Sequence, residues 1–109
     1  SSGNGESSWR GIQVAGLNSQ QFNFPESIKS GVVIVKIDEN SPAVDKLDVG
    51  DVITEIWVGK VHKVIKDVQD FEAFSNEFKN NNKAVLITRL KVSDNGKVIK
   101  GLVSIKGEE

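Results

Sequence analysis

The apolar residues of this chain fall into five runs that polar or glycine-containing turns separate. Ile12 and Val14 alternate with polar or small residues after Trp9, which predicts a strand. The runs at 31–38 and 52–58 are rich in Val and Ile, and both predict strands with at least one buried face. The last two runs, 83–92 and 97–105, flank Asn95-Gly96, a pair that accepts positive φ and indicates a β-hairpin.

One segment has the periodicity of a helix. Its apolar residues recur at three- and four-residue spacing, at Val68, Phe71, Phe74 and Phe78. Asp67 is a good N-cap, and Asp70 holds the acidic position of a capping box. Residues 80–82 are all Asn and are expected to end the helix. We expect the phenylalanines of this stripe to pack in the core.

Two shorter helical turns are also predicted. Asn18 is positioned to cap a helix through Phe22. Ser41 caps a second turn, with Pro42 at the first helical position, where its missing N–H costs nothing. Together these elements predict an α+β domain: a small barrel or sandwich of five to six strands, with one long and one or two short helices.

The chain of 109 residues is long enough for one domain and too short for two. Residues 1–8 contain only Ser, Gly, Asn and Glu, so they are expected to form a disordered tail or linker. The domain is predicted to cover residues 9–106, and 107–109 form a second tail. Any targeting segment would lie outside this sequence.

The composition argues against several kinds of chemistry. Cysteine is absent, which excludes disulfides, thiolate catalysis and cysteine-based zinc sites. His62 is the only histidine, and no nucleophile motif accompanies it, so neither a catalytic triad nor a metal site is expected. The phosphate-binding and dinucleotide-binding glycine motifs are missing, so no cofactor is expected.

Two surface features leave alternatives. The segment 60–66 is basic, but it has no interleaved aromatic residues and the net charge of the chain is −1, so nucleic acid is not an expected partner. Trp57 lies at the end of a predicted strand. It is either a partly buried rim residue or an exposed anchor for a partner.

The order of the motifs is more specific than any one of them. The chain reads WRGIQV (9–14), GVVIVKI (31–37), SPA (41–43), LDVGDVI (47–53), VGK (58–60) and DVQDFEAF (67–74). This order resembles the PDZ domains of HtrA/Deg-type serine proteases, in the circularly permuted bacterial layout. It is most similar to their second, C-terminal PDZ domain. The resemblance covers nearly all of residues 9–105.

The resemblance implies a non-catalytic module that binds C-terminal or unfolded peptide segments by strand addition. Trp9, Arg10, Gly11 and Ile12 match the loop that offers backbone N–H groups to a peptide carboxylate. The peptide groove would lie between Gln13 and Val14 on the strand and Val68, Glu72 and Ser75 on the helix. The phenylalanine stripe would face the other way. The same resemblance implies a parent serine endopeptidase in the periplasm or cell envelope, with a role in protein quality control and with neighbouring protease or PDZ domains as partners.

Two residues depart from the family pattern. Arg10 and Ser75 stand where the pocket usually has aliphatic side chains. Glu72 is expected to pair either with a basic side chain of a peptide or with Arg10 itself, which would close the groove. A second function therefore stays open, in which the domain docks against neighbouring domains or subunits and its peptide groove is closed.

Overall fold

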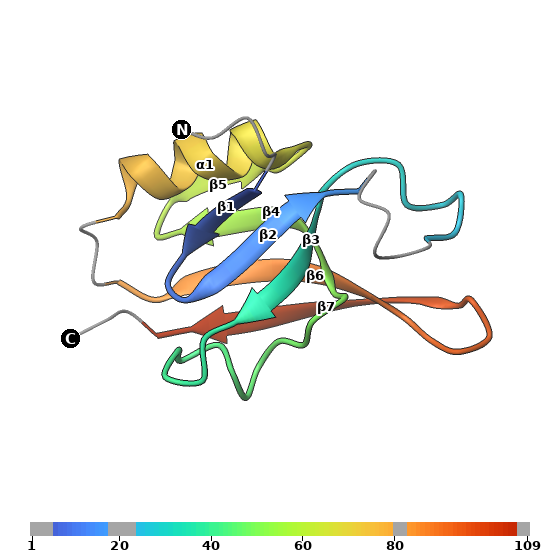
Figure 1. Cartoon of the computed structure of the whole chain (residues 1–109). Coiled ribbons are helices and arrows are strands. Elements are labelled where there is room, and N and C mark those ends of the chain that lie inside the picture. The colour runs from blue at the N-terminus through green and yellow to red at the C-terminus, as the bar shows by residue number, and fades with distance from the viewer. Residues whose placement is uncertain (1–5, 18–23, 80–82, 107–109) are drawn as a thin grey trace.

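The computed structural model of the chain describes residues 6–17, 24–79 and 83–106, and within them it has seven strands and one helix (Figure 1). The strands are β1 (Glu6–Trp9), β2 (Ile12–Gly16), β3 (Val32–Ile37), β4 (Val52–Val58), β5 (Val61–Val64), β6 (Val85–Val92) and β7 (Val98–Ile105), and the helix is α1 (Val68–Glu77). All pairings are antiparallel and follow the order β1-β2-β3-β4-β6-β7, with β5 added beside β4. The predicted α+β class with one long helix is confirmed.

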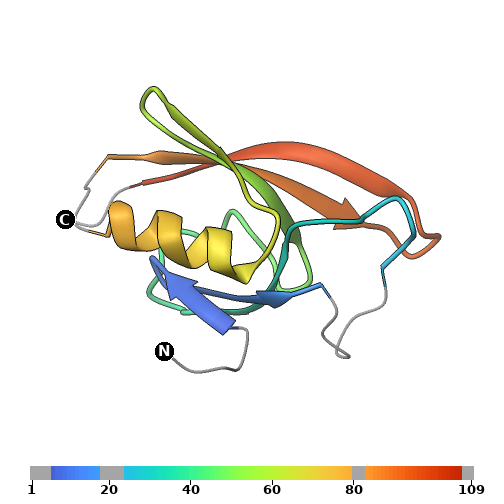
Figure 2. The ribbon, with the colours of Figure 1, turned by 90° about the horizontal axis from the view of Figure 1, so that it is seen from above.

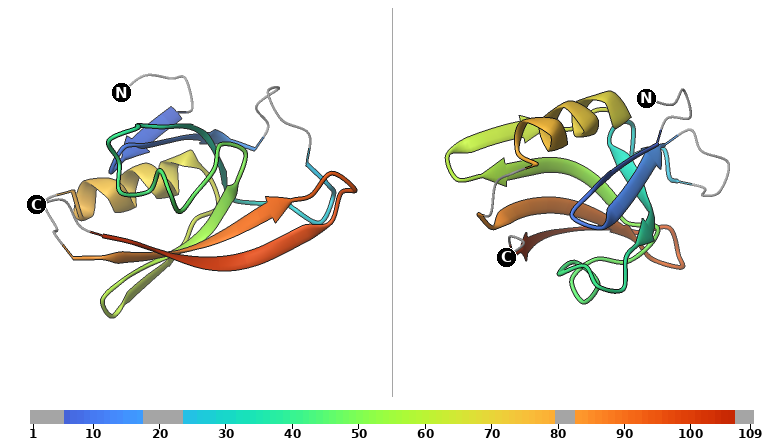
Figure 3. Two further views of the ribbon diagram at one scale, coloured as in Figure 1. Left: turned by 90° about the horizontal axis from the view of Figure 1, so that it is seen from below. Right: turned by 60° about the vertical axis from the view of Figure 1, so that its left-hand side comes forward.

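The sheet is strongly curved, and α1 lies across its open side. Figure 2 shows the helix between the β1–β2 hairpin and the long β6–β7 hairpin. The helix packs directly against β1 and β2, and the further views in Figure 3 show the sheet bending around it. One continuous hydrophobic core results, with contributions from every strand except β5 and from α1.

The five predicted strands are present, and the structure adds two. β5 follows the two-residue loop Gly59-Lys60 and pairs with β4, although all four of its residues are exposed. β1 corrects the predicted domain boundary, because residues 6–8 were assigned to a disordered tail. The backbone groups of β1 pair with β2, so this strand needs no apolar alternation of its own. The remaining predicted tail residues, 1–5 and 107–109, lie outside the described part of the chain.

The long helix begins as predicted. The Asp67 carboxylate accepts a hydrogen bond from the Asp70 N–H at 3.0 Å. The Asp70 carboxylate accepts from the Lys66 N–H at 3.1 Å, one residue before the N–H that a capping box binds. Phe71 and Phe74 are buried, as the stripe predicts. The helix ends at Glu77 with Phe78 as its C-cap, before the Asn residues that were expected to end it.

The turn predictions have mixed outcomes. The Ser41 hydroxyl accepts from the Ala43 N–H at 3.0 Å, but residues 41–46 form successive turns in place of a helix. The β6–β7 hairpin is confirmed, and Gly96 takes φ 82° in its loop while Asn95 keeps a negative φ. The predicted short helix at 18–22 lies outside the described residues.

Candidate functional site

The predicted carboxylate-binding loop is the tight turn of the β1–β2 hairpin. Trp9 pairs directly with Ile12, which leaves Arg10 and Gly11 as the two loop residues. Their φ angles are 54° and 79°, the signs that a type I′ turn requires. The Ile12 amide is therefore engaged by the hairpin and does not point into an open anion-binding nest. This corrects the expectation for the loop.

Bonds from other parts of the chain hold this turn. The Asp38 N–H donates to the Gly11 carbonyl at 2.7 Å, and the Ser41 hydroxyl donates to the Arg10 carbonyl at 2.6 Å. A Cβ on Gly11 would lie 2.6 Å from the Ser41 Cβ, so only glycine fits this approach.

The Arg10 side chain is buried and joins the turn to the ends of two distant strands. Its Nη2 donates to the Lys83 carbonyl at 2.8 Å, and its Nη1 donates to the Lys106 carbonyl at 3.1 Å. The guanidinium also lies over the Trp9 ring, 5.1 Å from the centroid, in a cation–π contact. Among the described residues it binds these carbonyls and not the carboxylate of Glu72.

The strand position beside β2 is filled. β3 pairs with one edge of β2, and β1 pairs with the other in the register Glu6–Ala15 to Trp9–Ile12. β1 is antiparallel to β2 and lies against α1, which is where an added peptide strand was expected (Figure 1). The predicted vacant groove is therefore wrong for this structure, because the N-terminal segment of the chain itself occupies it.

Trp9 closes the space between β1 and the helix. Trp9 is 7% exposed, and its ring makes T-shaped contacts with Phe71 and Phe74 at centroid distances of 6.2 and 5.9 Å. Val14 and Val68, which were predicted to line the groove, and Ile12 of the predicted loop are buried in the same cluster. These residues and the Trp9 indole belong to one buried cluster. Because Phe71 and Phe74 contact the indole, the expectation that the phenylalanine stripe faces away from the groove is wrong.

The other predicted groove residues are placed differently. Ser75 is buried, and its hydroxyl donates to the Glu72 carbonyl at 2.8 Å, so it bonds to its own helix. Glu72 is partly exposed. Gln13 is also partly exposed, and it borders a shallow depression of about 360 Å³ with Ser8, Trp9, Arg10, Gly11, Lys36 and Asp38. This depression lies beside the hairpin turn.

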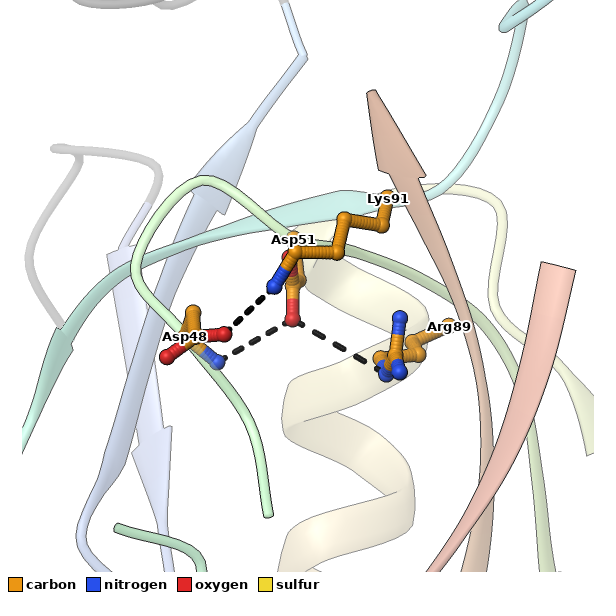
Figure 4. A network of polar contacts seen from close by, with 4 residues as sticks. All are labelled: Asp48, Asp51, Arg89 and Lys91. Atoms are coloured by element: carbon orange, nitrogen blue, oxygen red, sulfur yellow. Dashed lines mark hydrogen bonds and ion pairs between the residues drawn. The ribbon is translucent and has the colours of Figure 1, made fainter. Parts of the chain in front are cut away.

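A polar network that the sequence did not reveal lies near the start of β4 (Figure 4). The buried Asp51 carboxylate accepts from the Asp48 N–H at 3.0 Å and lies 4.0 Å from the Arg89 Nε. The Lys91 Nζ donates to the Asp48 carboxylate at 2.5 Å. The Gly50-Asp51 pair signals a turn in the sequence, but nothing local indicates that β6 supplies the cations.

Burial and charge shift three pKa values in this network. Burial raises the pKa of the Asp51 carboxyl above its usual 3.8, against the opposing hydrogen bond from Asp48 and the nearby cations. The hydrogen bond and charge of Lys91 lower the pKa of Asp48, and the same pair raises the pKa of Lys91. The Arg89 Nε and Nη1 are buried without a hydrogen-bond partner, so the Arg89–Asp51 pair is not well aligned.

The remaining candidates for chemistry form a small surface cluster. Trp57 is partly buried and stacks on His62 with centroids 4.6 Å apart, which agrees with the rim position. The His62 Nε2 lies 2.9 Å from the Glu55 carboxylate. The described residues contain no group of three His, Asp or Glu side chains placed to hold a metal ion.

In the described part of the chain, no helix has the length and apolar character that crossing a bilayer requires.

No family model matches the chain, and no curated protein matches it. The function is therefore inferred from the geometry described above.

Proposed function

We propose that this chain is a non-catalytic protein-interaction domain of the PDZ type, from an HtrA/Deg-type serine protease. It takes a C-terminal or unfolded peptide segment as an added strand between β2 and α1. Its parent protein would act in protein quality control in the periplasm or cell envelope. Neighbouring protease or PDZ domains would be further partners.

One observation carries the proposal. The position between β2 and α1 holds an extended segment that runs antiparallel to β2 and ends in a side chain buried against the helix. Strand addition needs this arrangement: main-chain pairing along one edge and a pocket for a side chain. In this structure the segment is Glu6–Trp9.

The test is an amide-resolved NMR titration of the full chain with a hydrophobic C-terminal peptide. Perturbation should concentrate at Gln13 and Val14 on β2 and at Val68 and Glu72 on α1. Lys60, in the β4–β5 loop, serves as the internal control. If the amides of β2 and α1 stay unchanged up to about 1 mM peptide, peptide capture is wrong.

The pairing of β2 on both edges favours a second candidate function. In this reading β1 closes the groove permanently, and the domain serves to dock neighbouring domains or subunits. Deleting residues 6–106 from the parent protein would then change its particle size and leave its peptide affinity intact.

A further inference from the structure

We propose that β1 is a displaceable occupant of the peptide position, and that the segment replacing it carries an aromatic side chain where Trp9 now lies. This inference rests on the proposed function, which supplies the incoming peptide. It adds a mechanism, strand exchange, and a class of partner: an extended segment of another protein with an exposed aromatic residue.

The anchoring of the hairpin turn permits exchange. The Arg10 and Gly11 carbonyls are bound by Ser41 and Asp38, and the Arg10 guanidinium is bound by the Lys83 and Lys106 carbonyls. The partner residues in these four bonds all follow β2 in the sequence, and none of them belongs to β1. Residues 6–9 are therefore able to leave while the turn keeps its place, with the hinge between Trp9 and Arg10.

The backbone pairing of β1 is reproducible by another strand. Because a two-residue loop joins the strands, Trp9–Ile12 and Ser7–Val14 are the hydrogen-bonded pairs, and Ser8–Gln13 is a non-hydrogen-bonded pair. An incoming antiparallel strand makes the same bonds to Ile12 and Val14 whatever its sequence. Main-chain pairing therefore does not distinguish one peptide sequence from another, and specificity for a peptide depends on where its side chains bind.

The surroundings of Trp9 select an aromatic partner. The rings of Phe71 and Phe74 make T-shaped contacts with the indole at 6.2 and 5.9 Å, and the Arg10 guanidinium lies over the indole, 5.1 Å from its centroid. Edge-to-face and cation–π contacts both need a π system, so an aliphatic side chain of similar size loses them. A segment with Phe or Trp at this position is favoured over one with Leu.

The effective concentration of β1 at its own binding position determines how strongly it competes with a free peptide. β1 is tethered by a two-residue loop, so it competes with free peptide at an effective concentration in the millimolar range or above. The apparent affinity for free peptide is reduced by the small fraction of molecules in which β1 is released. Weakening β1 should therefore strengthen peptide binding, the opposite of what loss of a structural strand would do.

The experiment uses the full chain with Trp57→Phe, which leaves Trp9 as the only tryptophan. The probe is an extended peptide with one Phe and no Trp, and the matched control peptide has Leu in its place. The Phe peptide should shift the Trp9 emission to longer wavelength as the indole enters water, and the Leu peptide should bind at least ~5-fold more weakly.

Two backbone variants complete the test. Ser7→Pro removes an N–H that faces β2, and it should raise the peptide affinity about 10-fold or more. Ser8→Pro removes an N–H that faces away from β2, and it should change the affinity much less.

Several outcomes would overturn the inference. If the β2 amides shift on binding while the Trp9 emission stays constant, exchange is wrong although the proposed function stands. If neither the unsubstituted chain nor the Ser7→Pro variant binds peptide, strand exchange and the proposed function are both wrong. If the chain alone forms a dimer that Ser7→Pro dissociates, the occupant is a second copy and the proposed partner class is wrong.

Discussion

The ring of Trp9 stands edge-on to the ring of Phe74, with centroids 5.9 Å apart and planes 82° apart. This contact joins the first described strand to the only described helix, although the two residues are far apart in the sequence. It fixes β1 in the space between β2 and α1, and it makes one indole responsible for both the packing and the occupancy of the proposed binding position.

Trp9→Ala should lower the free energy of unfolding by about 3–5 kcal/mol, because it removes a buried aromatic side chain from the core. Trp9→Phe should cost much less, since a smaller ring keeps the contacts with α1. Chemical denaturation followed by circular dichroism measures both. Leu102→Ala is the control, because Leu102 is 61% exposed. Equal losses for Trp9→Ala and Leu102→Ala would show that Trp9 is not a core residue.

Gly11→Ala should destabilise the domain more than Gly96→Ala does. Both glycines have positive φ, 79° and 82°, so both substitutions carry a backbone penalty of about 1–2 kcal/mol. Only Gly11 also meets a neighbour, the Ser41 Cβ at 2.6 Å, whereas a Cβ on Gly96 would enter open space. Ser41 is held by its bond to the Arg10 carbonyl, so it does not retreat freely. Urea denaturation of the two variants gives the comparison, and identical losses would contradict the close approach.

Asp51 should make the fold less stable as the pH rises. Because burial raises its pKa in the folded state, the folded chain holds this proton more tightly than the unfolded chain. The resulting stabilisation is complete below the usual pKa of 3.8 and is lost as the pH rises through the folded value. Asp51→Asn should therefore gain stability relative to the parent chain between about pH 3 and pH 7.

Asp48 provides the matched control for that measurement. Lys91 lowers its pKa, so its contribution is present above the usual value of 3.8 and is lost as the pH falls through the folded value. Asp48→Asn should therefore lose stability relative to the unsubstituted chain as the pH rises toward 3.8, and the difference should stay constant above that pH. Urea denaturation at each pH measures both differences, and parallel curves for the two variants would contradict the assignment.

Asp67→Ala should cost about 0.5–2 kcal/mol, because it removes the oxygen that caps the Asp70 N–H. Asp67→Ser keeps a capping oxygen and should retain most of the stability. Hydrogen exchange of the first turn of α1 is the local measurement. Faster exchange with Ala and near-parent exchange with Ser is the expected result, and no difference between them would show that the cap is unimportant.

The sequence was sufficient for elements that carry their own pattern. The Val/Ile runs of β3, β4, β6 and β7 and the phenylalanine stripe of α1 reflect burial, and burial imposes periodicity on the side chains. β1 carries no such pattern, since Glu6–Ser8 are polar and their order comes from main-chain pairing with β2. β5 was not predicted because all four of its residues are exposed, so burial imposes no apolar pattern on its sequence.

The candidate site was predictable in its walls and not in its occupancy. Val14 and Val68 both lie in the buried core cluster, as strand alternation and helical spacing imply for apolar positions. Which segment lies between them depends on a tertiary contact of Trp9 that no local pattern encodes. The Asp51–Arg89 pair could not be predicted from the sequence either, because the pairing of β4 with β6 brings its two residues together.

The guanidinium of Arg10 connects the β1–β2 turn to the C-terminal hairpin, because it donates to the Lys83 carbonyl before β6 and to the Lys106 carbonyl after β7. Any pull on the segment that follows β7 is thereby transmitted to the hairpin turn at the hinge of β1. A force applied at Lys106 would therefore act on the turn from which β1 departs, next to the proposed peptide position.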